Sequence, residues 1–139
     1  MPRAATSTLV DTSALLALAN PRDQYHDRAV ETAHRIIKQG QRLVGTTLVL
    51  AELHAHLLHR ADEGRARVVV GSLLDDPIYE WLDVPVSLVQ AAHGAWLERF
   101  RDQHFTLTDA VSFEVMQRRG IGVAFAYDRH FEIAGFRLL

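Results

Sequence analysis

Along the chain, short apolar runs typical of buried strands alternate with longer segments whose apolar residues recur at helical spacing. Five short runs are predicted strands: residues 7–10, 42–45, 78–84, 122–127 and 135–139. Six longer segments are predicted helices: residues 13–19, 23–40, 46–60, 63–76, 85–103 and 107–120. This alternation predicts an α/β fold with a central, mostly parallel five-stranded sheet flanked by helices.

Capping residues refine where these helices begin. Thr46 or Thr47 is the predicted N-cap of the helix 46–60, and Thr108 that of the helix 107–120. Ser87 and Gln90 match the spacing of a capping box in the helix 85–103. The helices should therefore start directly after the loops that follow the strands.

Composition narrows the class of protein. The chain has 139 residues, 48% of them hydrophobic and 23% charged, which fits one globular domain over residues 1–139. It has no cysteine, so a disulfide framework or a thiolate metal site is excluded. No apolar run reaches the length of a signal-peptide core or a membrane span. We therefore expect a cytoplasmic protein that does not enter the membrane.

Four acidic residues lie at the ends of predicted elements. Asp11 ends the first strand, Asp128 ends the fourth, Asp109 opens the last helix, and Glu52 lies near the start of the helix 46–60. Ligands of open parallel sheets bind outside the carboxyl ends of the strands. The sequence therefore predicts that these four acids converge on one cleft.

Such a cluster requires protons or cations. Two carboxylates about 4 Å apart repel each other by roughly 4 kcal/mol at an effective dielectric constant near 20. All-oxygen ligands suit hard cations such as Mg²⁺ or Mn²⁺, which also accept phosphate oxygens. The pattern predicts metal-assisted hydrolysis of a phosphodiester.

Four segments of the chain resemble the signature segments of the PIN-domain family, and in particular its VapC-type toxins. They are "LVDTSALLAL", "TTLVLAEL", "LTDAVSFEVMQRRG" and "VAFAYDRHFEIAGFRLL", in the family's order. The resemblance implies a Mg²⁺- or Mn²⁺-dependent endoribonuclease with Asp11, Glu52, Asp109 and Asp128 as the metal-binding acids. It also implies that a hydroxyl of Thr12 or Ser13 steadies Asp11 or contacts phosphate.

The same resemblance implies partners. These are an RNA substrate, a small cognate antitoxin that neutralises the toxin, and a second copy of the chain in a homodimer. Two alternatives stay open: a housekeeping PIN-domain nuclease without an antitoxin, and a non-catalytic binding module that retains the fold. The intact set of four acids argues against the binding module.

Each single acid also has a plain structural reading. An aspartate at a strand–helix junction is most often a helix N-cap, and Asp109 would also favour a helix start through the dipole. Phosphoryl transfer to Asp11 is disfavoured, because Ser13 stands where a dehalogenase-like enzyme would have a second aspartate, and Lys38, the only lysine, is poorly placed for a receiver domain. It is the combination of all four acids that favours a metal site.

Basic residues give weaker indications of where a substrate would bind. Setting the four acids aside turns the formal net charge from −2 to +2, so RNA binding would rely on the metal and on scattered arginines. Arg129, Arg118 and Arg119 are candidates for phosphate contacts, although most surface arginines are simply solvated. His130, beside Asp128, is expected to pack next to Phe131 or to help position a substrate.

Glu52, His56 and His59 share one helix stripe, but their spacing is not that of a zinc motif, and we expect the histidines on a polar face or an interface. The large aromatic residues are expected in the core or at an interface rather than as platforms for bases; they are Trp81, Trp96, Phe100 and Phe113.

Overall fold

The computed structural model describes residues 6–139 and contains one five-stranded sheet in the order β3-β2-β1-β4-β5, in which every described pair of neighbours is parallel. The strands are β1 (Ser7–Val10), β2 (Arg42–Thr46), β3 (Tyr79–Leu82), β4 (Val123–Phe125) and β5 (Arg137–Leu138). The helices are α1 (Thr12–Ala19), α2 (His26–Lys38), α3 (Thr47–Arg60), α4 (Glu63–Asp75), α5 (Val86–Ala92), the π-helix η1 (His93–Glu98), α6 (Leu107–Arg119) and α7 (His130–Ile133). The predicted α/β fold with five strands is confirmed.

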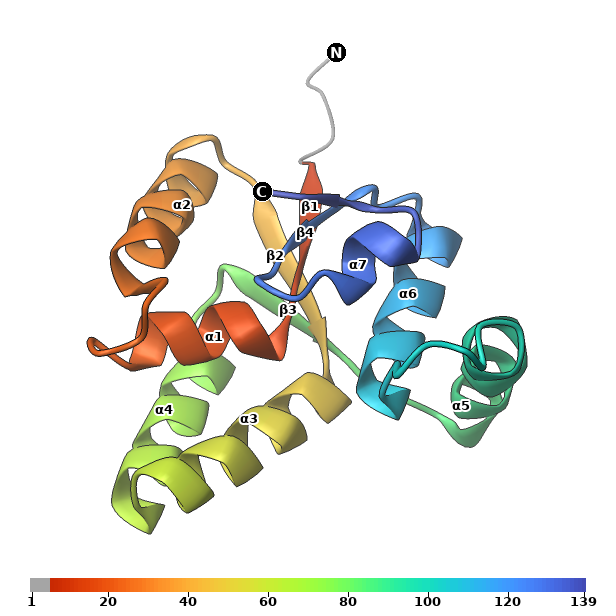
Figure 1. Cartoon of the computed structure of the whole chain (residues 1–139). Helices are drawn as coiled ribbons and strands as arrows, with labels where there is room; N and C mark the ends of the chain where they lie inside the picture. The colour runs from red at the N-terminus through yellow and green to blue at the C-terminus, as the bar shows by residue number, and fades with distance from the viewer. Residues whose placement is uncertain (1–5) are drawn as a thin grey trace.

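Helices cover both faces of the sheet (Figure 1). α1 to α4 lie on one side, and α5, η1, α6 and α7 lie on the other. Successive strand residues point to opposite faces, so Leu9 and Val44 enter the core under α6, whereas Val10 and Leu43 enter the core under α1 and α3. Apolar residues on both sides of each strand explain why its sequence is a short continuous hydrophobic run.

The aromatic residues pack as the sequence predicted. Trp96 and Phe113 are buried, and their rings meet at 5.2 Å in an edge-to-face arrangement. Phe113 makes further edge contacts with Phe105 and Phe131, each at 5.0 Å. Such pairs contribute about 0.5–1.5 kcal/mol each beyond their buried area. Trp81 and Phe100 pack against the two cores from the partly buried layer, so the expectation of core positions is confirmed.

Several local predictions were wrong. The segment 85–103 is not one regular helix, because α5 passes into the π-helix η1 at His93. The expected capping box of Ser87 and Gln90 does not form: Pro85 is the N-cap of α5, and no side chain caps it. Pro85 lacks an N–H and starts the helix through its fixed φ instead.

Two further differences concern the segments that flank the acids. Thr106, rather than Thr108, is the N-cap of α6. The segment between β4 and β5, expected to be a plain turn, forms the short helix α7. Within residues 6–139, no helix is both long and apolar enough to cross a membrane.

Candidate active site

The four predicted acids line one pocket at the carboxyl edge of the sheet. Asp11 directly follows β1, Asp128 lies in the loop after β4, and Asp109 is in the first turn of α6. Glu52 of α3 also lines this pocket, which has a volume of about 180 Å³. Parallel strands bring their carboxyl ends to the same edge, so residues more than 100 positions apart in the sequence meet there.

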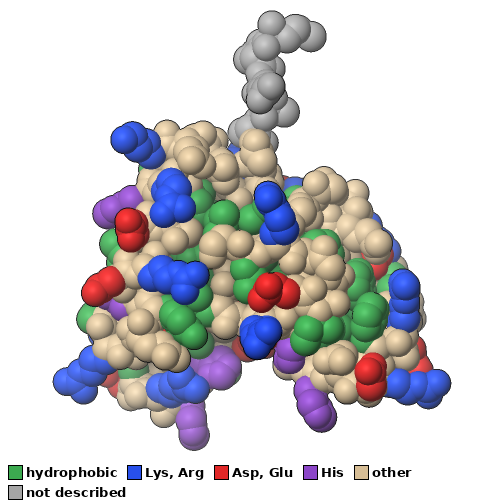
Figure 2. All heavy atoms as spheres, turned by 45° about the horizontal axis from the view of Figure 1, so that its top comes forward, with side chains coloured by type: hydrophobic (Ala, Val, Ile, Leu, Met, Phe, Trp, Pro, Cys, Tyr) green, Lys and Arg blue, Asp and Glu red, His purple; other side chains and the backbone are tan. Residues whose placement is uncertain are grey.

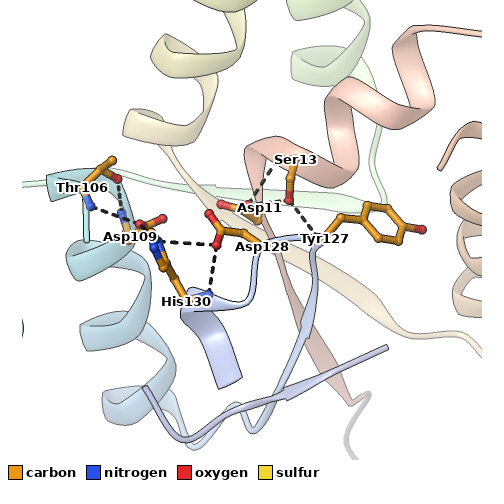
Figure 3. A network of polar contacts seen from close by, with 7 residues as sticks. All are labelled: Asp11, Ser13, Thr106, Asp109, Tyr127, Asp128 and His130. Atoms are coloured by element: carbon orange, nitrogen blue, oxygen red, sulfur yellow. Dashed lines mark hydrogen bonds and ion pairs between the residues drawn. The ribbon is translucent and has the colours of Figure 1, made fainter. Parts of the chain in front are cut away.

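Asp11 is held by the start of α1. Its Oδ2 accepts hydrogen bonds from the backbone N–H of Ser13, at 3.2 Å, and from the Ser13 hydroxyl, at 2.7 Å. The same hydroxyl oxygen accepts a bond from the backbone N–H of Tyr127, at 2.9 Å (Figure 3). Ser13 therefore ties the end of β1 to the loop after β4 and fixes the orientation of Asp11.

Asp109 is held by a capping box at the start of α6. The Thr106 hydroxyl accepts a hydrogen bond from the Asp109 backbone N–H, and Asp109 Oδ2 accepts one from the Thr106 N–H, both at 3.1 Å. Both bonds satisfy N–H groups that the helix start would otherwise leave unpaired. The capping role and the site position of Asp109 therefore coexist.

His130 connects two of the acids. Its Nδ1 lies 3.0 Å from Asp109 Oδ2 and 3.4 Å from Asp128 Oδ1, and its backbone N–H donates to Asp128 Oδ1 at 2.9 Å. The ring also makes an edge contact with Phe105 at 5.2 Å. Ligand atoms of Asp109, Asp128 and His130 lie within 4.8 Å of one another, close enough to hold one metal ion.

The sequence reading gave too little weight to this histidine. His130 was expected to pack beside Phe131 or to help position a substrate, and its side chain points into the acid cluster (Figure 3). The available signal was a histidine two positions after a predicted site aspartate, in a turn. Turns of this kind bring residues i and i+2 together, as the bond from the His130 N–H to Asp128 shows.

Burial and mutual repulsion make the cluster electrostatically unfavourable. Burial raises the pKa of Asp11 to about 6; the hydrogen bonds from Ser13 lower it, and the charges of Asp109 and Asp128 raise it. Burial also raises the pKa of Asp109, while bonds from Thr106 and His130 lower it and the charge of Asp128 raises it. Both shifts show that the pocket disfavours an uncompensated negative charge.

The donor set fits a hard divalent cation. The carboxylates of Asp11, Asp109, Asp128 and Glu52 line the pocket, and a cation there would favour the charged form of Asp11, whose pKa is raised first by burial and then by the charges of Asp109 and Asp128. The side chains present therefore suit a divalent metal ion.

Of the remaining predicted site residues, some line the pocket and others lie away from it. Thr12 is buried and lines the pocket, and its hydroxyl has no hydrogen-bond partner within residues 6–139. Arg129 is exposed at the start of α7 and does not line the pocket. Arg118 and Arg119 form ion pairs with Glu114 and Glu80 at the far end of α6, about 18 Å from its start at 1.5 Å per residue. Phosphate contacts beside the acids are therefore excluded for those two.

The histidine stripe of α3 forms no metal centre of its own. In the described part of the chain, the one group with metal-ligand spacing is that of Asp109, Asp128 and His130. His56 lines the acid pocket beside Glu52, whereas His59 is exposed. The sequence reading did not include His56 in the site, although its i+4 spacing from Glu52 places both on one helix face.

Basic side chains form no continuous surface on the face shown in Figure 2. Lys and Arg side chains are interspersed there with acidic, apolar and neutral polar ones. This distribution agrees with the small net charge of the chain.

Comparisons with known proteins agree with the fold. Residues 8–137 match the family model of the PIN domain. The chain is 34% identical over 128 residues to the 23S rRNA-specific endonuclease VapC20 of Mycobacterium tuberculosis, covering 91% of this chain and 93% of that protein.

Solved structures give the same result. The crystal structure of Mycobacterium tuberculosis VapC20, a sarcin–ricin loop cleaving toxin, superposes with a TM-score of 0.80 at 29% identity, over 93% of this chain and 95% of that one. A chain of VapBC2 from Rickettsia felis, bound to a DNA fragment from its promoter, has a TM-score of 0.71 at 13% identity, over 96% of this chain and 98% of that one. The chain therefore belongs to the PIN-domain family, as a VapC-type toxin endoribonuclease of a toxin–antitoxin system.

Proposed function

We propose that the chain, acting as one domain over residues 1–139, cleaves ribosomal RNA by metal-dependent hydrolysis of a phosphodiester bond. The observation that carries this proposal is the convergence of Asp11, Asp109, Asp128 and Glu52 on one pocket. The choice of 23S rRNA as substrate is supported by the 34% identity to a 23S rRNA-specific endonuclease over 91% of this chain. An rRNA substrate would place the protein in the cytoplasm.

In this mechanism Asp11, Asp109 and Asp128 would hold Mg²⁺ or Mn²⁺, together with Glu52 of α3. The bound metal supplies an activated water and neutralises charge on the phosphate. Ser13 orients Asp11, and Thr106 orients Asp109, through the hydrogen bonds described above. Orienting partners of this kind keep ligands in a productive geometry before the metal binds.

The buried hydroxyl of Thr12 has a place in the same proposal. It lines the pocket and has no partner within residues 6–139, so it is free to donate to a phosphate oxygen. A buried hydroxyl without a partner is costly, and a bound phosphate would satisfy it. Arg129, exposed on α7, remains a candidate for a more distant phosphate.

Replacing Asp109 tests the proposal directly. Asp109→Asn keeps the size of the side chain and an acceptor for the Thr106 N–H, but removes the charge that binds metal. We expect loss of Mg²⁺- or Mn²⁺-dependent cleavage of 23S rRNA in purified ribosomes. Asp75→Asn, exposed on α4, is the matched control and should retain full activity. Unchanged cleavage by Asp109→Asn would show that the chemistry lies elsewhere.

Two partners complete the proposal. A small antitoxin that places a basic side chain near the acids would be favoured electrostatically. We also propose a homodimer, as the family resemblance implies. Co-expression with the product of a short neighbouring reading frame should restore the growth of cells that produce the toxin, and light scattering of the purified chain should give twice the monomer mass. Failure of either measurement would remove that partner while leaving the nuclease proposal intact.

A further inference from the structure

A second pocket lies beside the acid pocket, near the C-terminal ends of α1 and α3. It has a volume of about 410 Å³, and three arginines, Arg22, Arg60 and Arg65, line it. Asp23 is its one acidic lining residue. Three arginines against one aspartate make the lining of the pocket predominantly cationic, and the Asp23 carboxylate accepts a hydrogen bond from the Tyr25 N–H at 2.8 Å.

The two pockets are neighbours along the same pair of packed helices. Leu16 of α1 lines both of them. On each helix, lining residues recur every four positions from one pocket to the other: Thr12, Leu16 and Asn20 on α1, and Glu52, His56 and Arg60 on α3. Glu52 and Arg60 are eight positions apart, which corresponds to about 12 Å along the helix axis. This arrangement forms a short path from the acids to the arginines.

The three arginines are available to a ligand. Among residues 6–139, none of them forms an ion pair with a carboxylate, whereas Arg67, Arg118 and Arg119 all do. Arg65 donates to the backbone carbonyl of Ala19, which holds its guanidinium at the end of α1. A cation near a helix C-terminus is favourable by itself. That effect accounts for one arginine at each helix end and not for a pocket lined by three.

We propose that this arginine pocket binds backbone phosphates of the RNA a few nucleotides away from the bond that is cleaved. This inference rests on the proposed function, because it assigns a path to the strand that occupies the acid pocket. The guanidinium group matches phosphate geometry with two parallel hydrogen bonds. The RNA therefore lies along α1 and α3, held at one end by the metal site and at the other by Arg22, Arg60 and Arg65.

An acidic protein segment is the competing occupant. Continuity with the acid pocket favours RNA, because the phosphates that flank a bound phosphodiester have to leave the pocket along its walls. The wall of α1 and α3 provides such a path, because three arginines that form no ion pair within residues 6–139 follow the acid pocket along it, about 12 Å from Glu52.

Salt-dependent RNA binding tests the proposal. The Asp109→Asn chain, which leaves RNA intact, is titrated with a fluorescent single-stranded RNA decamer over a range of salt concentrations. Each phosphate contact on a single strand contributes about 0.7 to the slope of log K against log salt. We expect Arg60→Ala and Arg22→Ala to lower the slope by about 0.7 each, and the double variant by about 1.4. Arg60→Lys keeps the charge and should retain most of the slope.

Arg67→Ala on α4 is the matched control, because Arg67 is exposed, carries the same charge and does not line the pocket. It should leave the slope unchanged. Equal slopes for the parent and for the Arg22/Arg60 double variant would overturn the proposal. If the double variant lost binding to an oligoglutamate peptide but kept the RNA slope, the pocket would be assigned to a protein partner. If either of these results were obtained while the wild type still cleaved RNA in an Asp109-dependent way, the proposed function would stand. If the wild type did not cleave RNA at all, the proposed function and the arginine-pocket proposal would both be wrong.

Discussion

The two walls of the acid pocket differ in how firmly they hold their acids. On the wall formed by α6 and the loop after β4, Asp109 and Asp128 receive hydrogen bonds from Thr106 and His130. On the α3 wall, the side chain of Glu52 forms no hydrogen bond within residues 6–139. Hydrogen bonds therefore hold the acids of the first wall without a metal, whereas no such bond within the described residues holds Glu52 on the second wall.

Packing beneath each wall explains the contrast. Phe105, Phe113 and Phe131 support the start of α6 and the loop that carries His130, with ring centroids about 5 Å apart. Glu52 extends from a helix whose buried residues, such as Leu53 and Leu57, face away from the pocket into the other core. Preorganised ligands avoid the cost of ordering side chains at the moment of binding, about 0.5–1.5 kcal/mol each.

Removing one acid from each wall should give the largest difference in metal affinity between the two walls. Asp109→Asn is expected to weaken metal binding by more than about 100-fold, because it removes a ligand and not merely an orienting partner. Glu52→Gln should lower the free energy of metal binding by about 1 kcal/mol less than Asp109→Asn does. The reason is that the cost of ordering the Glu52 side chain offsets part of its contribution. Calorimetric titration with Mn²⁺ measures both. A larger loss for Glu52→Gln would reverse the assignment of the two walls.

Asp11, between the walls, should reveal the cost of the cluster in the metal-free protein. Its pKa near 6 exceeds the unfolded value of 3.8, so the folded state binds the proton more tightly and loses stability as the pH rises between these values. Asp11→Asn removes this penalty, which amounts to about 3 kcal/mol above pH 6. In urea unfolding without metal, the free energy of unfolding of the variant should rise relative to that of the wild type between about pH 4 and pH 6. Below about pH 4 the difference between the two should stay constant.

The two histidines that line the pocket offer a smaller contrast. His130→Ala removes a group that bridges Asp109 and Asp128, and should lower Mn²⁺ affinity about tenfold. His56→Ala removes a side chain for which the structure shows no bond to an acid, and its Mn²⁺ affinity should stay near the wild-type value. Equal affinities for the two variants would show that the bridge has no orienting role.

The N-caps of the two walls should give the smallest effect. Thr106→Ala and Thr46→Ala each remove a cap, from α6 and from α3, and each should lower the free energy of unfolding by about 1 kcal/mol. Only Thr106→Ala should also weaken metal binding, because the Thr106 hydroxyl accepts a hydrogen bond from the Asp109 N–H and so holds the helical turn that carries this acid. Urea unfolding and Mn²⁺ titration of the same samples distinguish the two. A metal defect in Thr46→Ala would show that the position of α3 is as critical as that of α6.

Much of the fold was predictable because its signals are local. Runs of apolar residues mark β1, β2 and β4, and helical spacing with an N-cap marks α1 and α3. The prediction was wrong where contacts between distant segments decide the structure. In the segment 85–103, the backbone widens into the π-helix η1, whose Trp96 packs on Phe113 and donates to Glu114 of α6.

The acids were found from the sequence alone because their positions at the ends of elements follow from the order of strands and helices. Asp11 needed only to follow a buried strand, and Asp109 only to open a helix. The sequence by itself thus determined which carboxylates meet, since a parallel sheet places all its strand ends at one edge.

Only the tertiary structure decided how those carboxylates are held and what lies beside them. The bridge of His130 to Asp109 and the bond from Tyr127 to Ser13 join residues 21 and 114 positions apart. The arginine pocket likewise needs the ends of α1 and α3 to pack together. Side-chain direction and burial depend on the packed neighbours, and no local pattern of residues specifies them.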